Sequence, residues 1–334
     1  MGTKAVPAEQ RRHRPASLYL RPAATVKPDL APTGALCYQL RTDPDVSCDH
    51  CGATDARRLF EKGGDAYVRC ERCGLIYIAP QPTDAELAAI YDEHYYDAWG
   101  SGVGADHVAD LKRRTFGLLF DRLKRATGLQ DGRLLDLGCA TGYLLEVARA
   151  RGFEPFGVEL NPLSARQAQE KFGEDHVHCG TADDAPFPPA SFAAVVMSDL
   201  LEHVRSPRKL LAQARELLGP DGTLVVVAPD VGGLSSRMLG SNWTDYKREH
   251  LFYFDKRTLS AALAQAGFEL RQVRAFPKFL DLSYIRQQLV EYRTPVFTPL
   301  ARALHAALPD RARRIPFPIY AGSMMAIAAK AGRG

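Results

Sequence analysis

The sequence predicts an α/β protein built on a doubly wound, mainly parallel sheet, and three observations support this prediction. From residue 130 onward, short apolar runs typical of buried strands alternate with segments of helical periodicity. One strand-to-helix junction, residues 133–148, carries the glycine pair Gly138 and Gly142. The next apolar run, residues 153–160, contains the acidic Glu159 near its end. In such a sheet, a ligand binds outside the carboxyl ends of the strands, where the strand order reverses.

The glycine turn has the properties of a cofactor-binding loop. Gly138 can adopt backbone angles closed to other residues, and Gly142 lets the chain pass close to a ligand. The amides that open the following helix carry partial positive charge, which suits a carboxylate. Glu159 lies about 20 positions further on, where it can accept hydrogen bonds from ribose hydroxyls. These features fit nucleotide-type cofactors and S-adenosylmethionine alike.

Four motifs in chain order resemble the class I S-adenosylmethionine-dependent methyltransferases. The turn Asp136-Leu-Gly138-Cys-Ala140-Thr-Gly142 resembles that family's Asp-x-Gly-x-Gly-x-Gly loop, with Ala140 replacing the usual middle glycine, a small-for-small change that should be tolerated. Residues 178–187 resemble the adenine-binding loop, residues 191–204 the fourth strand with its Leu-Glu-His-Val end, and residues 219–229 the turn into the fifth strand. The resemblance covers residues 110 to 275 and implies a methyltransferase with S-adenosylmethionine as cofactor.

The alternation of strand and helix signals gives the expected elements of the sheet. Strands are expected near 133–138, 154–159, 176–180, 193–198, 222–228 and 268–275, and a last strand at 321–330. In the family that this core resembles, the last strand runs antiparallel to the others. The expected fold is therefore a Rossmann-like, doubly wound, seven-stranded sheet with an antiparallel last strand.

The resemblance also assigns the cofactor-binding residues. They are Asp136, Gly138, Cys139, Ala140, Thr141, Gly142 and Tyr143 in the glycine turn, Glu159, Leu160 and Asn161 after the second strand, Thr181, Ala182 and Asp183 in the adenine loop, and Ser198 at the end of the fourth strand. Two interpretations of the adenine loop stay open. Either Asp183 replaces the family's acidic residue, or the backbone of Thr181 and Ala182 binds adenine while Asp183 caps the next turn.

Two histidines are candidates for a catalytic base. Methyl transfer from a sulfonium is an in-line displacement that depends mainly on alignment, and a hydroxyl acceptor also benefits from a positioned base. His203 ends the fourth strand beside the expected methyl position, and His250 lies in a polar loop. His203 could instead only orient its loop, because Leu-Glu-His-Val is widespread in this superfamily.

Acidic residues precede His203. Asp199 and Glu202 resemble a pattern that contributes to catalytic metal binding in some ubiquinone-pathway O-methyltransferases, although that pattern begins with Glu. A solvated helix start with acidic residues is the simpler interpretation. No second metal is predicted.

The N-terminal part carries a metal-binding pattern. Two Cys-x-x-Cys pairs, each followed by glycine, are separated by a short strand-rich segment; the four residues are Cys48, Cys51, Cys70 and Cys73. This spacing predicts a structural zinc ribbon whose four sulfurs complete the coordination. Disulfides would need an oxidising compartment, and the sequence shows no signal peptide. Cys37, Cys139 and Cys179 are expected to be small apolar fillers.

Composition limits the classes of partner. The chain has 334 residues, 46% of them hydrophobic, and a net charge of +4. The charge of the segment 48–80 is nearly balanced, which argues against a nucleic acid as the main partner. No apolar run is long enough to span a membrane. The absence of a secretory apolar core predicts a cytoplasmic protein.

The expected organisation has four parts. Residues 1–36 form a disordered basic tail, 37–80 the zinc ribbon, 81–128 a helical connector that caps the cofactor cleft, and 129–334 the core. Two segments interrupt the core. Residues 231–254 form a loop over the crevice, rich in polar-tipped side chains, and residues 277–318 form a helical insertion that could be a lid or the face of a homodimer.

The leading hypothesis is a methyltransferase that O-methylates a small molecule in the biosynthesis of a natural product, sugar or envelope component. The first alternative is an RNA base methyltransferase that uses the ribbon to recognise RNA. The second is a non-enzymatic scaffold with a vestigial core. The intact Asp136, Gly138, Gly142 and Glu159 count against the scaffold.

Overall fold

A computed structural model of the protein describes residues 47–90, 105–291 and 297–331. These residues belong to one unit, Thr42–Gly334. The predicted tail 1–36, Cys37 and residues 91–104 of the predicted connector lie outside the described residues. Each helix in the described ranges is too short or too polar to cross a bilayer.

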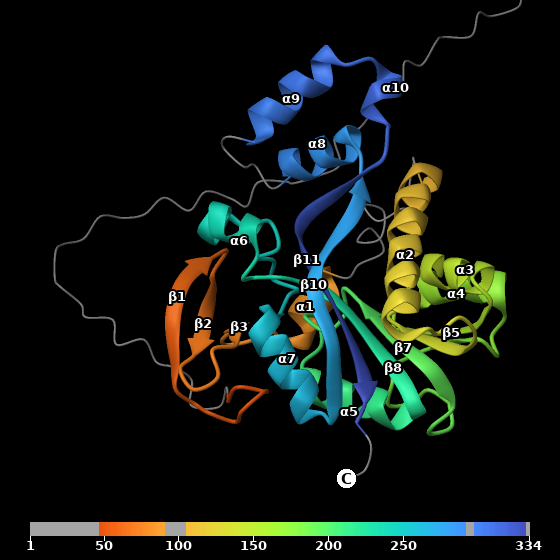
Figure 1. Ribbon diagram of the computed structural model, residues 1–334. Coiled ribbons are helices and arrows are strands. Elements are labelled where there is room, and N and C mark those ends of the chain that lie inside the picture. Colours follow the sequence, from red (N-terminus) through yellow and green to blue (C-terminus); the bar gives the residue numbers. More distant parts are fainter. Residues whose placement is uncertain (1–46, 91–104, 292–296, 332–334) are drawn as a thin grey trace, which may run out of the picture. The chain divides into compact units, whose positions relative to one another are not determined.

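A seven-stranded mixed sheet forms the core (Figure 1). Its order is β10-β11-β8-β7-β4-β5-β6, and the strands are β4 (Gly132–Leu137), β5 (Phe153–Glu159), β6 (Val177–Cys179), β7 (Phe192–Ser198), β8 (Leu218–Pro229), β10 (Phe268–Leu280) and β11 (Phe317–Lys330). Strands β4 to β8 pair in parallel, and β11 runs antiparallel to both of its neighbours. The strand order reverses at β4, since β5 and β7 lie on opposite sides of it. The predicted Rossmann-like α/β fold with a mixed sheet is confirmed.

Helices cover both faces of this sheet. Alternate strand residues point to opposite faces, and the buried side chains accordingly form two clusters: Leu134, Val196 and Val225 lie in one, whereas Leu135 and Val195 lie in the other. The first cluster is covered by α2 (Ala105–Thr127) and α3 (Tyr143–Ala150), and the second by α5 (Pro207–Leu217) and α7 (Lys256–Gln265). The sheet is therefore buried on both sides, as its continuous apolar strands require.

Three strand boundaries differ from the prediction. β8 begins at Leu218, before the predicted turn, and its register against β7 shifts between the pairs Phe192–Leu218 and Ala194–Thr223. Residues 219–222 thus form an irregularity within the strand. β10 continues to Leu280 and β11 begins at Phe317, because the two strands remain paired beyond the rest of the sheet.

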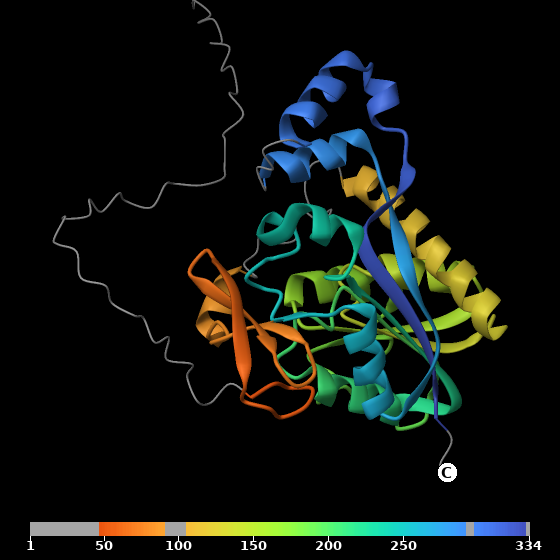
Figure 2. The same ribbon diagram turned by 60° about the vertical axis from the view of Figure 1, so that its left-hand side comes forward.

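The N-terminal strands form a second sheet that includes a strand of the core. β1 (Ala56–Lys62), β2 (Asp65–Cys70) and β3 (Ile76–Ile78) are antiparallel, and β3 also pairs with β9 (Phe252–Tyr253). Figures 1 and 2 show this sheet alongside α1 and α7. Because β9 belongs to the predicted loop 231–254, the second sheet physically holds that loop.

The remaining helices include α6 and η2, which lie within residues 231–254, where a loop was predicted. They are α1 (Asp84–Ile90), α4 (Pro162–Phe172), α6 (Leu234–Leu239), the 3₁₀ turn η2 (Gly240–Asn242), α8 (Leu282–Glu291), α9 (Phe297–Ala307) and α10 (Asp310–Arg313). α1 begins with a capping box: Thr83 N donates to Glu86 Oε2 at 2.8 Å, and Glu86 N donates to Thr83 Oγ1 at 3.3 Å. The helices expected in the insertion correspond to α8 and α9.

Candidate cofactor and acceptor site

A cavity of about 940 Å³ lies at the carboxyl ends of β4, β5 and β7. This volume is near the upper end of the usual range of about 300–1,000 Å³ for ligand sites. Thirteen of the predicted cofactor residues line it, namely Asp136, Gly138, Cys139, Ala140, Thr141, Tyr143, Glu159, Leu160, Asn161, Thr181, Ala182, Asp183 and Ser198. Both candidate bases, His203 and His250, line it as well. Gly142 does not line the cavity.

The glycine turn has the backbone conformation that its sequence suggests. Gly138 and Gly142 have φ of 77° and 86°, and Ala140 between them has φ of 46°. A Cβ on Gly138 would approach Leu200 to 3.1 Å, and one on Gly142 would approach Phe172 to 3.1 Å. The turn therefore needs glycine for its angles and for its close packing.

Glu159 fixes the turn from the next strand. The side chain is buried, Oε2 accepts a hydrogen bond from Ala140 N at 2.8 Å, and Oε1 accepts one from Asn161 N at 2.8 Å. Asn161 in turn caps α4 through its side chain. A carboxylate offers about four acceptor sites and can therefore accept hydrogen bonds from several donors at once. The geometry is consistent with a carboxylate that also binds ribose hydroxyls.

Asp136 provides a test of whether the predicted cofactor fits. The carboxyl is buried, and its Oδ1 has no hydrogen-bond partner within the described part of the chain. Burial, and then the charge of Glu159, raise the pKa of Asp136 well above its usual value. A buried polar atom without a partner commonly marks the place of a ligand donor. The ammonium group of S-adenosylmethionine would supply such a donor beside the glycine turn.

The adenine loop differs from one of its two predicted forms. Asp184, and not Asp183, caps the turn, since its Oδ1 accepts hydrogen bonds from Thr181 N at 2.6 Å and Thr181 Oγ1 at 2.7 Å. The Asp183 carboxylate instead accepts from Lys209 at 2.8 Å and from Gln213 at 2.5 Å on α5. The cap assigned to Asp183 is therefore wrong, although Asp183 does line the cavity.

The two candidate histidines lie together. Their rings meet edge to face, with centroids 4.6 Å apart and planes at 87°. His250 is buried and its Nδ1 has no hydrogen-bond partner among the described residues, so its place in the predicted polar loop does not expose it to solvent. Leu251 N and Phe252 N donate to the Glu202 carbonyl at 2.8 and 3.2 Å, which fastens this segment to the end of β7.

Glu202 is part of the same cluster. Its side chain is 1% exposed and neither carboxyl oxygen has a hydrogen-bond partner in the described ranges, so the predicted solvated helix start is wrong. Ligand atoms of Glu202, His203 and His250 all lie within 4.8 Å of one another, a spacing at which they could hold a metal ion. Asp199 is separate from this group, since its carboxylate binds Lys278 Nζ through both oxygens at 2.9 Å.

Burial controls the protonation of this cluster. It lowers the pKa of His203 to about 4 and that of His250 well below its usual value, the positive charge of nearby groups adding to the effect for His250. Burial and the charge of Asp199 raise the pKa of Glu202 well above normal. At neutral pH both imidazoles are therefore uncharged, the form in which a ring nitrogen can accept a proton.

Lysines complete the acceptor side of the cavity, and the sequence analysis missed two of them. Lys112 from α2, Lys278 from β10 and Lys247 from the loop before β9 all line the cavity. Burial lowers the pKa of Lys112 to about 8, whereas the charge of Asp199 keeps that of Lys278 raised. Lys278 escaped notice because the strand was expected to end at residue 275. The available signal was a single lysine within the apolar run 276–280.

The aromatic residues of the loop 231–254 are packing residues. Trp243, Tyr246 and Tyr253 are buried, and Tyr246 contacts the rings of Phe60 and Tyr67 on β1 and β2. The polar residues of the loop divide between two roles. Arg248 faces the second sheet and pairs with Asp65 at 3.3 Å and Glu86 at 2.5 Å, whereas Asp245, Lys247 and His250 face the cavity.

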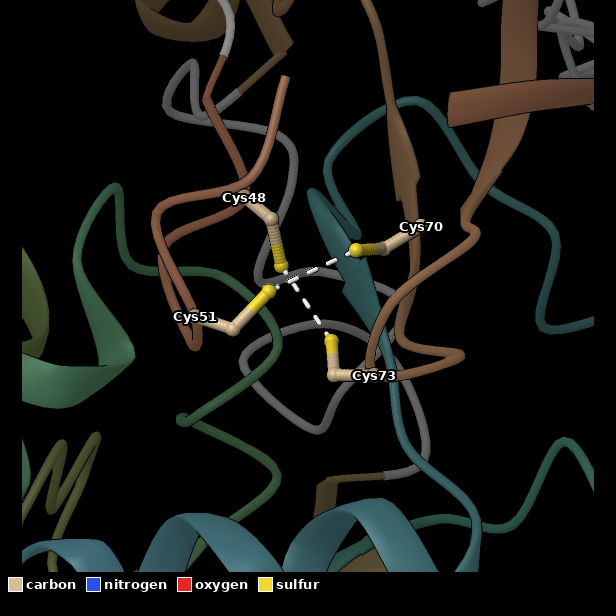
Figure 3. Close-up of side chains that lie close together, drawn as sticks. All are labelled: Cys48, Cys51, Cys70 and Cys73. Carbon is tan, nitrogen blue, oxygen red and sulfur yellow. Dashed lines mark hydrogen bonds between the residues drawn. The ribbon is translucent and has the colours of Figure 1, made fainter. Parts of the chain in front are cut away.

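The four predicted ligand cysteines converge (Figure 3). Cys48 Sγ lies 3.5 Å from Cys73 Sγ, Cys51 Sγ lies 3.5 Å from Cys70 Sγ, and all four sulfurs lie within 4.8 Å of one another. A tetrahedral zinc thiolate with bonds of about 2.3 Å has sulfur–sulfur edges of about 3.8 Å, so the donor set fits zinc. The cysteines are free thiols, and Cys139 is buried as expected, but Cys179 is exposed and so is no apolar filler.

Comparison with known proteins adds to these observations. A family model described as a methyltransferase domain matches residues 111–273. The chain is 31% identical over 177 residues to a ubiquinone biosynthesis O-methyltransferase of Azorhizobium caulinodans. The aligned region covers 50% of this chain and 69% of that protein. The chain is 29% identical over 161 residues to the O-methyltransferase cnsE of Penicillium expansum, which covers 43% and 58%.

Other matches are shorter or more distant. A ubiquinone biosynthesis O-methyltransferase of Chromobacterium violaceum is 31% identical over 110 residues, and the chain spans only 47% of its length. The chain thus covers about half the length of the first curated relatives. Among solved structures it is similar to a SAM-dependent methyltransferase from Archaeoglobus fulgidus, with a TM-score of 0.47, 18% identity and coverage of 72% of this chain and 100% of that one.

Proposed function

Since this chain belongs to the S-adenosylmethionine-dependent methyltransferases, we propose that it transfers a methyl group to a hydroxyl of a small-molecule acceptor bound beside His203. The observation that carries the proposal is a single cavity with two chemically different halves. One half is the glycine turn with Glu159 and Asp136, and the other is a cluster of buried imidazoles, carboxyls and lysines. The curated relatives, which are named as O-methyltransferases, support a hydroxyl as the acceptor.

The cofactor half holds groups suited to each part of S-adenosylmethionine. Glu159 would accept hydrogen bonds from the ribose, Asp136 would face the amino-acid end, and the loop at Thr181 and Ala182 would bind the adenine. The bound cofactor supplies an activated methyl group for in-line displacement. The chain contributes alignment, which accounts for most of the rate enhancement in such a reaction.

His203 is the preferred base of the two histidines. It is partly exposed to the cavity, whereas His250 is 6% exposed and packs edge-on against the His203 ring. With a pKa near 4, the His203 imidazole is neutral at the pH at which an acceptor hydroxyl must lose its proton. We assign His250 the role of holding the orientation of His203.

The four cysteines are proposed to bind one structural zinc ion. All four positions of a tetrahedral ion would be filled by sulfur, which leaves none for an acceptor. The ribbon contacts the acceptor half through the loop 231–254, here called the core loop. Lys62 Nζ donates to the carbonyls of Trp243 at 3.3 Å and Tyr246 at 2.9 Å, and Ile78 N donates to Leu251 O at 3.0 Å. We therefore propose that the ribbon supports the acceptor half.

A paired measurement on one variant tests the base. Mass-spectrometric screening of hydroxylated small molecules for a gain of one methyl group identifies an acceptor. His203→Ala is then expected to lower turnover by roughly 100- to 10,000-fold, the effect of losing a positioned base, while the affinity for S-adenosylmethionine stays close to wild type. His176→Ala, at a histidine that does not line the cavity, serves as the matched control.

Other outcomes would redirect the proposal. If His203→Ala lowers cofactor affinity, melting temperature and turnover together, His203 is structural. If its turnover is near normal and His250→Ala loses activity instead, the base is His250. A chain that fails to bind S-adenosylmethionine in calorimetry would contradict the proposed activity as a whole.

A further inference from the structure

The helices inserted between β10 and β11 expose an unusual set of apolar side chains. They lie on α9 and on the first residues before and within β11: Leu300 (62% exposed), Leu304 (47%), Ile315 (60%), Phe317 (43%) and Tyr320 (64%). We name this set the α9 surface. In Figures 1 and 2, α9 lies on the far side of α8 from the central sheet. The cavity lining includes none of these residues.

Helix α9 carries apolar side chains both on its buried face and on part of its exposed surface. Ala301 is buried, and the Thr298 hydroxyl donates to the Leu289 carbonyl of α8 at 2.6 Å, so one face is already covered. The opposite, exposed face carries Leu300, Ala303, Leu304 and Ala307 at the i, i+3, i+4 and i+7 positions. Apolar side chains at this helical spacing normally face a packing partner. The exposed apolar side chains of α9 therefore indicate that an apolar partner or surface covers them.

The segment that carries these apolar side chains is rich in positive charge. The segment 282–320 contains six arginines against two acids and no lysine. Arg286, Arg302, Arg311 and Arg314 are exposed, and the only exposed acid among the described residues of the segment, Asp310, pairs with Arg313 at 2.9 Å. The formal excess of four positive charges in this segment equals the net charge of the whole chain.

This combination distinguishes between two apolar partners. In a two-fold symmetric dimer, the same patch meets itself, so a second copy would bring two arginine-rich surfaces together with few acids to compensate them. An anionic bilayer surface accommodates both features. Leucine and aromatic side chains enter the boundary of the acyl chains, while arginines contact the headgroups.

We propose that the α9 surface binds peripherally to membranes that contain anionic phospholipids. The apolar side chains of α9 and of the start of β11 enter the interface, and Arg302, Arg311 and Arg314 contact lipid phosphates. This association is independent of the methyl-transfer reaction. It holds the chain at the bilayer surface without any segment that spans the membrane.

Vesicle binding by the full chain tests the proposal. Co-sedimentation is measured with vesicles of phosphatidylcholine alone and with vesicles containing phosphatidylglycerol. Wild type is expected to bind the phosphatidylglycerol vesicles, and less so as salt is raised. The double variant Leu300→Ser/Leu304→Ser should bind about tenfold more weakly, and Arg311→Gln/Arg314→Gln about 30-fold more weakly at low salt. Because these side chains are exposed, folding should persist, and circular dichroism verifies it.

The controls separate this surface from other contributions. Leu163→Ser changes a leucine that is 53% exposed on α4 and should bind vesicles like wild type. Binding that survives the double leucine variant would overturn the proposal, since it would originate elsewhere, such as in the basic residues 11–14. No binding of wild type to phosphatidylglycerol vesicles would overturn it too. Self-association in sedimentation that disappears in the leucine variant, without vesicle binding, would replace the bilayer with a second copy.

Discussion

Ala140 occupies a backbone conformation that favours glycine. Its φ of 46° lies in the left-handed region, between two glycines that also have positive φ. A residue with a Cβ loses about 1–2 kcal/mol in this region, whereas glycine does not, although glycine loses more entropy on folding. Alanine is therefore small enough for this turn. Its backbone conformation at this position, however, lowers the stability of the protein.

Replacing Ala140 by glycine should consequently stabilise the protein. We expect Ala140→Gly to raise the free energy of unfolding by about 0.5–1 kcal/mol, the net of relieved strain and added chain entropy. Urea denaturation measures the change. Gly138→Ala is the reverse control and should be destabilising for two reasons. Residue 138 has a φ of 77°, which is unfavourable for alanine, and the added Cβ would lie 3.1 Å from Leu200. A loss of stability in Ala140→Gly would contradict the strain argument.

Glu159 is the residue on which cofactor affinity should depend most clearly. We expect Glu159→Ala to weaken S-adenosylmethionine binding by about 1–3 kcal/mol, because the ribose hydroxyls lose their acceptor and the turn loses its bond to Ala140 N. Calorimetry measures the affinity. Glu154→Ala changes an exposed glutamate on the same strand and should bind normally. Unchanged affinity in Glu159→Ala would contradict the ribose assignment.

At the scale of elements, the ribbon and the core loop form one structural unit. β3 pairs with β9 through Ile76–Tyr253 and Tyr77–Phe252, and β9 begins two residues after His250. The side chains of Cys48, Cys70 and Phe252 share one buried cluster. Loosening of the metal site should therefore be transmitted to the acceptor half of the cavity more than to the glycine turn.

Metal removal tests this connection. Purified protein is expected to contain about one zinc ion per chain, and Cys70→Ser should lose it together with order in the ribbon. Hydrogen exchange should then accelerate in β3 and β9 while the strands β4 and β5 stay protected, and turnover should fall more than cofactor affinity. Cys179→Ser, at an exposed cysteine outside the cluster, is the matched control. Zinc-free wild type, or unchanged exchange in β9 of Cys70→Ser, would be incompatible with the proposed role.

Local pattern explains which elements the sequence could predict. Apolar runs and the glycine turn identify β4, β5 and β7, because these features are set by residues adjacent in the chain. β9 has two residues and no pattern of its own, so its pairing with β3 depends on tertiary contacts. The same holds for the added length of β10 and β11, whose ends pair with each other beyond the rest of the sheet.

At the scale of the whole molecule, the two halves of the cavity differ in how they are built. The cofactor half comes from consecutive strand-to-helix turns, so motifs along the chain identify its residues. The acceptor half brings together side chains from four parts of the chain: Lys112 from α2, His203 from the segment after β7, Lys247 and His250 from the loop before β9, and Lys278 from β10. No spacing rule connects these positions. The histidines could be proposed because they follow a recognisable strand end or lie in a polar loop, whereas Lys112 resembles any solvated lysine of an amphipathic helix.

The buried Asp136 links the stability of the whole molecule to pH. Because its pKa is raised in the folded protein, the folded state holds a proton that the unfolded state releases above a pH of about 3.8. The free energy of unfolding of the wild type is therefore highest, as far as Asp136 is concerned, at or below that pH. It falls as the pH rises toward the raised pKa.

Asp136→Asn cannot ionise and should escape this loss. The free energy of unfolding of each protein is measured in urea without cofactor. The difference between the variant and the wild type should increase in favour of the variant as pH rises from 4.5 to 8, by at most about 1.4 kcal/mol per pH unit. Asp131→Asn, at an exposed aspartate just before the same strand, should track wild type at each pH. A constant difference between Asp136→Asn and wild type would show that the carboxyl does not titrate differently in the two states. The gain in stability should be accompanied by a smaller rise in melting temperature on adding S-adenosylmethionine, because the buried carboxylate that destabilises the free protein is the group that the bound ammonium would satisfy.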